Sequence, residues 1–207
     1  PAVASAEVAS PSRRGFLLQS GAVGLGLALP TSGYGMWRAF GEPEVTESTI
    51  HVPGLPPSLS GTTIVLLTDL HAGAWVDRDF IAKVVARTNA LRPDLVAITG
   101  DLVDGSVARL APVVAPLADL KARMGTYFVL GNHEYYSGAE EWTAHLPSLG
   151  VRVLRNERVG IEGIDLLGVD DWSARQRGLG RGYDLERALA GRDPTRPAIL
   201  LAHQPRG

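Results

Sequence analysis

Four apolar runs, each ending in a carboxylate, amide or imidazole side chain, constrain the fold of this chain more than any other feature. Each holds four to six apolar residues, mostly β-branched or aromatic, and they stand at residues 62–69 (TTIVLLTD), 94–101 (DLVAITGD), 125–132 (GTYFVLGN) and 198–203 (AILLAH). Continuous apolar runs of this length indicate strands that are covered on both faces. We therefore expect an α/β fold built around buried strands.

Helical patterns separate the first three runs. Residues 78–91 place apolar side chains near one face, and residues 107–123 repeat the helical period despite two prolines. The polar run ends Asp69, Asp101 and Asn132 are 32 and 31 positions apart, which matches the size of a βαβ unit. Such crossovers make neighbouring strands parallel, so their carboxyl ends should meet at one edge of the sheet, where ligands of open α/β sheets bind.

The polar groups expected at this edge form a mixed set of nitrogen and oxygen donors. They are Asp69, His71, Asp101, Asp104, Asn132, His133 and His203. Carboxylates, an amide carbonyl and neutral imidazoles suit Mn, Fe or Zn better than an all-oxygen Ca or Mg site. Four contributing segments could serve two divalent ions, which with Asp69 and Asp101 would leave a net positive site that attracts a phosphate ester. Gly100 and Gly131 should let the backbone turn sharply and a substrate approach.

Three motifs in this order and spacing resemble those of the calcineurin-like metallophosphoesterases. They are D-x-H at 69–71, G-D-x-x-D at 100–104 and G-N-H-E at 131–134, and the resemblance covers roughly residues 60–207. It implies a four-layer αββα sandwich with the strand-like pieces of 151–170 in the second sheet. It also implies an enzyme that hydrolyses phosphate esters with a hydroxide bound between two metal ions (Mn, Fe or Zn).

The resemblance also implies a role for each site residue. Asp69 and His71 would bind the first metal, Asp101 would bridge, and Asn132 and His203 would bind the second. His133 would be catalytic: it is a non-ligand that stabilises the transition state and protonates the leaving oxygen. Asp104 would orient a ligand or a backbone turn. Glu134, Tyr135 and Tyr136 could shape the pocket rim, although packing explains them equally well.

The family's closing G-H-x-H motif, which supplies one histidine to each metal, would follow His203 and does not occur before Gly207. We therefore expect a C-terminally truncated domain with an incomplete second sheet. Residues 1–207 alone should bind metal weakly and be inactive, whereas the full-length protein should be an enzyme.

The N-terminal segment resembles a twin-arginine export signal. Arg13 and Arg14 precede an apolar, glycine-rich stretch over 15–29, a layout that favours export or membrane anchoring. With transmembrane helices upstream, the arginines could instead flank a span on the cytoplasmic face. Residues 1–45 are thus expected to be a signal or anchor plus linker, leading through an edge strand over 46–53 into a phosphoesterase domain over 46–207.

Composition excludes several kinds of function. The formal net charge of −2 argues against nucleic-acid binding, which needs a basic face. The chain has no cysteine, so thiolate nucleophiles and zinc–thiolate sites are excluded. No glycine-rich phosphate loop follows any predicted strand, which argues against a nucleotide-binding module without metals.

The substrate prediction depends on the N-terminal segment and on the opening of the domain, which resemble the membrane-associated branch of bacterial metallophosphoesterases. That likeness implies a phosphodiester or pyrophosphate bond of a lipid-linked substrate, either a phospholipid or a compound like UDP-2,3-diacylglucosamine. A general phosphodiesterase or phosphomonoesterase and a non-catalytic metal-binding scaffold are the alternatives. The basic stretch at 175–181 could contact an anionic or lipid headgroup, or could be a solvated loop.

Overall fold

The computed structural model describes residues 12–39, 41 and 43–204. The chain divides into two compact units between Thr46 and Glu47. In the first unit, α1 (Arg13–Ala39) is a 27-residue helix that contains Pro30. Among the described residues, no helix combines the length and the apolar character that crossing a membrane requires. The signal or anchor role of this segment stays a prediction.

The second unit begins without the expected edge strand, so that prediction is wrong. Residues 43–52 form neither helix nor strand, and Pro57–Leu59 form a short 3₁₀ turn (η1). In the described part of the chain no strand pairs with residues 46–53, and Pro53 lacks the N–H donor that a ladder bond would need there.

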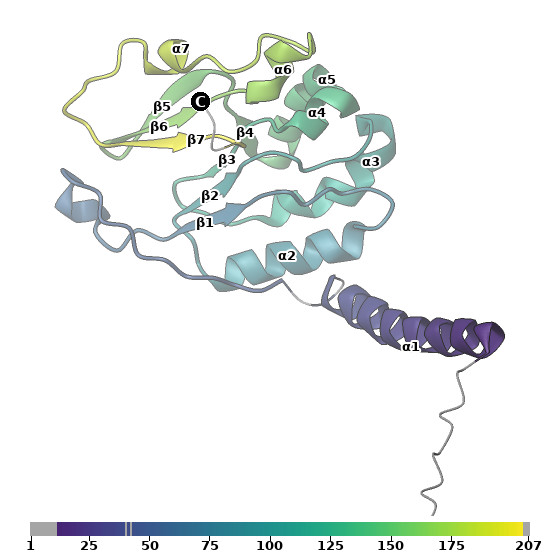
Figure 1. The fold of residues 1–207 in the computed structure, drawn as a ribbon. Helices are drawn as coiled ribbons and strands as arrows, with labels where there is room; N and C mark the ends of the chain where they lie inside the picture. Colours follow the sequence, from purple (N-terminus) through teal and green to yellow (C-terminus); the bar gives the residue numbers. More distant parts are fainter. Residues whose placement is uncertain (1–11, 40, 42, 205–207) are drawn as a thin grey trace, which may run out of the picture. The chain divides into compact units, whose positions relative to one another are not determined.

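A parallel sheet of four strands forms the centre of the second unit, as Figure 1 shows. Its order is β1-β2-β3-β4. All three strand pairs are parallel, and the strands are β1 (Ile64–Leu67), β2 (Leu95–Ile98), β3 (Thr126–Phe128) and β4 (Val151–Val153). The predicted strand–helix–strand order is confirmed.

Helices connect these strands in turn. They are α2 (Arg78–Ala90), α3 (Val107–Val114) with the 3₁₀ turn η2 (Ala115–Asp119), and α4 (Asn132–Ser137) and α5 (Ala139–His145) with the 3₁₀ turn η3 (Leu146–Leu149). The helix expected over 107–123 ends early, at Val114, because Pro116 in the next turn cannot donate an i to i−4 hydrogen bond. Side-chain capping starts α2, where the Asp77 carboxylate accepts from the Phe80 N–H at 2.9 Å.

A second sheet contains β5 (Glu157–Ile161), β6 (Ile164–Gly168) and β7 (Ala198–Leu201). β5 and β6 are antiparallel, whereas β6 and β7 are parallel. Between β6 and β7 lie α6 (Trp172–Gln176) and α7 (Leu185–Leu189). The assignment of all strands of 151–170 to this sheet is wrong for β4. It extends the first sheet because it follows α5 in another helical crossover, and Val151 joins the core beneath the helices.

Alternating side chains of the central strands separate four layers. In β2, Val96 and Ile98 join the core with the helices, whereas Leu95 and Ala97 join the core between the sheets. On the far side of the second sheet, Leu167 packs with Ala188 of α7. Figure 1 shows α2 and α7 on opposite outer sides of the two sheets. The expected αββα sandwich is therefore confirmed.

The two sheets pack tightly at Gly168, the last residue of β6. A Cβ atom added there would lie 2.3 Å from the Leu154 Cβ and 2.8 Å from a Val129 methyl group. Both distances are too short for real contacts, so only glycine fits between the sheets at this point.

Gly168→Ala should lower the free energy of unfolding by about 1–3 kcal/mol, because overpacking forces Leu154 and Val129 to move. Urea unfolding followed by circular dichroism measures this. The matched control is Gly160→Ala in β5, where the nearest atom is the flexible tip of Arg196 at 3.3 Å. Equal losses in the two variants would contradict the packing argument.

Candidate metal centre

The loops that follow β1 and β2 run side by side and carry the first candidate ligands. The Asp69 N–H donates to the Gly100 carbonyl at 3.1 Å, and the His71 N–H donates to the Asp101 carbonyl at 2.9 Å. These bonds continue the sheet ladder beyond the strands. They hold the three candidate ligands Asp69, His71 and Asp101 in register.

All three of these residues have left-handed backbone conformations. Their φ angles are 54° for Asp69, 49° for His71 and 52° for Asp101. This conformation costs a non-glycine residue about 1–2 kcal/mol. Such strain concentrates at functional sites, where surrounding contacts maintain it.

Two glycines allow the ends of β2 and β3 to touch. Gly100 has φ 89°, and a Cβ atom there would lie 2.3 Å from the Gly131 nitrogen. A Cβ atom on Gly131 would lie 2.2 Å from the Asp101 Oδ1. The expected sharp turn is found at Gly100, and both residues permit the close approach of two backbones.

The buried carboxylate of Glu134 joins these two strand ends. It accepts hydrogen bonds from four backbone N–H groups, those of Gly131 (2.7 Å), Asp101 (2.9 Å), Leu102 (2.8 Å) and Val103 (3.3 Å). Burial raises the pKa of Glu134, and the N–H donors of Gly131, Asp101 and Leu102 oppose that rise. The sequence left two interpretations open for this residue, the pocket rim or packing. Its signal was the position three residues after the helix N-cap, where a glutamate reaches back to backbone N–H groups.

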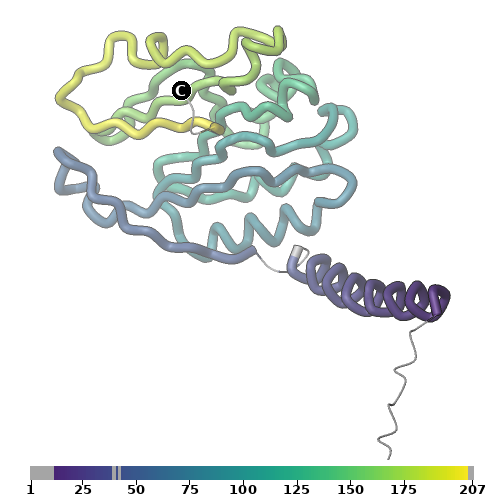
Figure 2. Tube along the Cα trace, in the orientation of Figure 1, coloured from purple at the N-terminus to yellow at the C-terminus, as the bar shows by residue number. Residues whose placement is uncertain are grey.

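Three imidazoles are oriented through their Nδ1 atoms. The Asp104 Oδ1 lies 3.0 Å from Nδ1 of His71 and 2.6 Å from Nδ1 of His133. His203 Nδ1 lies 2.8 Å from the Thr99 carbonyl oxygen and donates to it. Figure 2 shows the yellow end of the chain at β7 returning beside the strands of the first sheet. An imidazole whose Nδ1 is held by a hydrogen bond has its Nε2 available to bind a metal ion, which is the usual arrangement of metal-binding histidines.

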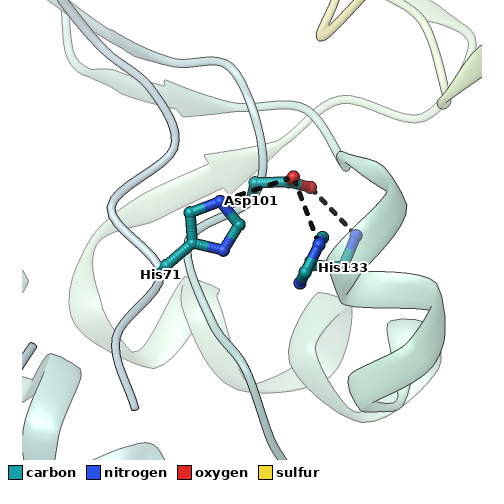
Figure 3. A group of neighbouring side chains, drawn as sticks. All are labelled: His71, Asp101 and His133. Carbon is teal, nitrogen blue, oxygen red and sulfur yellow. Dashed lines mark hydrogen bonds and ion pairs between the residues drawn. The ribbon is translucent and has the colours of Figure 1, made fainter. Parts of the chain in front are cut away.

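The three free Nε2 atoms converge on one carboxylate oxygen. The Asp101 Oδ2 lies 3.4 Å from that of His203, 3.8 Å from that of His71 and 3.9 Å from that of His133. Figure 3 shows His71 and His133 on either side of Asp101. The Asp101 side chain is buried, whereas the Asp69 carboxylate is half exposed.

The donor spacing fits metal ions. Ligand atoms of His71, Asp101 and His133 lie within 4.8 Å of one another, and so do those of Asp69, Asp101 and His203. Two atoms bound about 2.0–2.3 Å from a tetrahedral ion lie roughly 3.3–3.8 Å apart, which is close to the 3.4, 3.8 and 3.9 Å from Asp101 Oδ2 to the three Nε2 atoms. Each group can therefore hold a divalent ion, and Asp101 belongs to both.

Asn132 lies beside this cluster as the first residue of α4, directly after Gly131. The next residue, His133, donates its backbone N–H to Asp101 Oδ1 at 2.9 Å. The start of α4 is thus held against Asp101. Coordination by the Asn132 carbonyl stays a prediction.

The remaining histidines lie elsewhere in the structure. His51 is exposed, and His145 packs its ring against Trp142 in α5 at a centroid distance of 5.7 Å. Neither belongs to a metal-binding group of the described residues.

The neighbouring Asp101 carboxylate favours the protonated form of His203. The Asp101 carboxylate, followed by the Thr99 carbonyl, raises the pKa of His203 to about 9 against the opposing effect of burial. Burial raises the pKa of Asp101, but His203 and the His133 N–H outweigh it and leave that pKa below its usual value. Because a coordinating imidazole is neutral, a divalent ion here would replace the proton on His203 as the positive charge beside Asp101.

Comparison with known proteins agrees with this geometry. A family profile described as calcineurin-like phosphoesterase matches residues 62–207. The chain belongs to this family. Its members are metal-dependent hydrolases of phosphoester bonds.

Several relatives align with most of this chain. A bovine protein named transmembrane protein with metallophosphoesterase domain is 45% identical over 183 residues, covering 83% of this chain and 41% of the relative. An uncharacterized metallophosphoesterase of Helicobacter pylori strain J99 is 41% identical over 200 residues, covering 95% of this chain and 52% of the relative. The chain thus spans about half the length of these relatives.

Glu134→Gln should lower the free energy of unfolding by about 1–3 kcal/mol, because one amide NH₂ would face backbone N–H donors and leave them unsatisfied. Metal content should fall as well, since Asp101 loses its backbone support. Thermal unfolding and elemental analysis of the full-length protein measure both effects. Glu157→Gln, at an exposed position in β5, is the control. A variant as stable and as metal-loaded as this control would refute the role of Glu134.

Proposed function

We propose that the full-length protein hydrolyses phosphate esters with two divalent ions, Mn, Fe or Zn. Asp69 and His71 would hold the first ion, Asp101 would bridge, and Asn132 and His203 would hold the second. The observation that carries the proposal is the convergence of three Nε2 atoms on the buried Asp101 Oδ2, beside the second carboxylate of Asp69.

When bound, the ions would supply positive charge that polarises a phosphoryl group and lowers the pKa of a water molecule. The chain's own residues position the reaction. Asp101 is held by its backbone bond to Glu134 and by the His133 N–H. The Asn132 side-chain carbonyl would add an uncharged oxygen ligand, so it would not reduce the positive charge of the ions.

His133 is proposed as the general acid. Its Nδ1 contacts the Asp104 carboxylate at 2.6 Å, which fixes the orientation of the ring. Its Nε2 then faces the site, where it can donate a proton to the leaving oxygen. The same atom has the spacing of a metal ligand, so the two roles need to be separated by experiment.

Two variants of the full-length protein test these assignments. Asp101→Asn should lose both metals, because one bridging carboxylate serves both groups. His133→Ala should keep its metals but lose about 10²–10⁴-fold in kcat toward bis-p-nitrophenyl phosphate, the range for a general acid. Asp119→Asn and His51→Ala, both at exposed positions, are the matched controls. Metal analysis and nitrophenolate release measure the outcomes.

Two outcomes would favour alternatives to these assignments. Loss of metal in His133→Ala would make His133 a ligand instead of an acid. A wild-type protein that binds metal but hydrolyses neither bis-p-nitrophenyl phosphate nor p-nitrophenyl phosphate would favour the non-catalytic scaffold.

A chain ending at Gly207 should bind metal more weakly than the full-length protein and lack phosphodiesterase activity. The reason is the family's G-H-x-H motif, which would add one histidine to each metal and does not occur before Gly207. Titration with Zn²⁺ or Mn²⁺ and nitrophenolate release compare the two proteins. Equal activity would show that the ligand assignment is wrong.

For the substrate, we propose a lipid-linked phosphodiester or pyrophosphate, such as a phospholipid or a UDP-2,3-diacylglucosamine-like compound, handled by a membrane-associated or exported protein. Two observations support this. Apolar side chains of α1, among them Phe16, Leu17 and Leu18, are exposed after Arg13 and Arg14. A bovine relative is named a transmembrane protein. A general phosphodiesterase or phosphomonoesterase and the cytoplasmic face of the membrane are the alternatives, and nucleic acid is not expected as a partner.

A further inference from the structure

A basic segment, residues 173–182, follows the start of α6 and carries three arginines. It contains Arg175, Arg177 and Arg181, and no acidic residue stands between Trp172 and Tyr183. Within residues 12–39, 41 and 43–204, none of the ion pairs involves these three arginines. All three are exposed. Such an arrangement suits an anion supplied from outside the chain.

The two ends of the basic segment are tied together. The amide of buried Asn156 donates to the Gly182 carbonyl at 2.9 Å and accepts from the backbone N–H groups of Asp170 and Asp184 at 3.0 Å. Asp171 caps α6 by accepting from the Ser173 N–H at 2.9 Å. The base of the segment therefore has a defined position.

The basic segment packs on α4, the helix that carries His133, and Figure 1 shows α6 beside α4 and α5. A Cβ atom on Gly180 would lie 2.9 Å from the ring of Tyr135. The Arg177 guanidinium donates to the Tyr136 hydroxyl and lies 5.8 Å from that ring's centroid. The Tyr136 ring in turn packs edge-on at 5.7 Å from the His133 ring. One aromatic ring thus separates the guanidinium from the candidate catalytic imidazole.

A hollow lies beside His133 and Tyr136. Its lining includes Asp104, Gly105, His133, Tyr136 and Ser137. Tyr136 therefore borders the hollow and contacts Arg177 as well. A substrate whose reacting phosphate lies beside His133 can extend along this hollow to Tyr136, the residue whose hydroxyl contacts Arg177.

We propose that Arg177 binds a second anionic group of the substrate, one aromatic ring away from the reacting phosphate. This inference rests on the proposed phosphoesterase function and adds a substrate class, esters that carry a further phosphate. A guanidinium matches phosphate oxygens through its planar fork of donors. The Tyr136 hydroxyl accepts from one donor of that fork and so positions it, which leaves the other donors for the ligand. The second phosphate belongs either to a soluble ester or to the headgroup of a membrane phospholipid.

The test compares two chromogenic diesters with the metal-loaded full-length protein. Bis-p-nitrophenyl phosphate has one phosphate, whereas glycerol 1-(p-nitrophenyl phosphate) 3-phosphate carries the chromogenic diester at one end and a second phosphate at the other. Arg177→Ala should raise KM for the second diester about tenfold with little change in kcat, because one charge-assisted contact is lost. KM for bis-p-nitrophenyl phosphate should change much less. The matched control, Arg87→Ala at an exposed position in α2 outside the basic segment, should leave both KM values near wild type.

Binding to vesicles distinguishes the two sources of the second phosphate. Wild type and Arg177→Ala are sedimented with phosphatidylcholine vesicles that contain or lack phosphatidic acid. Binding that needs phosphatidic acid and is lost in Arg177→Ala supports the inference with a lipid headgroup as ligand. A KM effect on the diester with no such loss supports it with a soluble ester.

Two results would overturn the inference in different ways. If wild type hydrolyses both diesters and Arg177→Ala changes neither KM nor their ratio, the second-anion site is refuted and the phosphoesterase function stands. If wild type hydrolyses neither diester, the proposed function fails and the inference fails with it.

Discussion

The buried carboxylate of Glu134 is the contact on which the rest of the site depends. Backbone N–H groups at the ends of β2 and β3 would otherwise lie buried and unpaired, at a cost of about 1–3 kcal/mol each. One carboxylate satisfies four of them and joins the two strand ends. It also maintains Asp101 in a left-handed conformation that an aspartate would seldom adopt alone. The strained backbone of the site is thus balanced by a hydrogen-bond network outside the ligand set.

Asp101 lies where side chains from both sheets meet. Its carboxylate faces His71 from the loop after β1, His133 from α4 and His203 from the segment after β7. Because β7 belongs to the second sheet, the packing of the two sheets controls how closely His203 approaches. The tight contact at Gly168 between the sheets therefore bears on the geometry of the metal centre, although it lies outside the ligand set.

Family membership and the donor geometry support metal-dependent phosphoester hydrolysis, yet neither identifies the substrate, because one fold hosts many reactions. Unlike the shared motifs, residues around the metal centre can bear on which substrate binds. The basic segment at 173–182 is positioned by Asn156 and by the tyrosines of α4, close to the imidazole proposed as general acid. Residues of this kind, which lie outside the ligands, are where substrate preference should be encoded.

The sequence by itself determined the parallel βαβ order, the strands β1, β2, β3 and β7, and the position of Asp69, Asp101 and Asn132 after strand ends, because apolar periodicity and repeat spacing are local properties. It did not assign β4 to the first sheet, since an apolar strand pattern does not specify its neighbour. It also left Glu134 with two possible roles, at the pocket rim or in packing. A glutamate three residues after a glycine does not by itself show which distant N–H groups it will contact. Only the tertiary structure decided these points, together with the approach of His203 to Asp101. They depend on contacts between segments about 30 to 100 residues apart, which form only when the whole domain is packed.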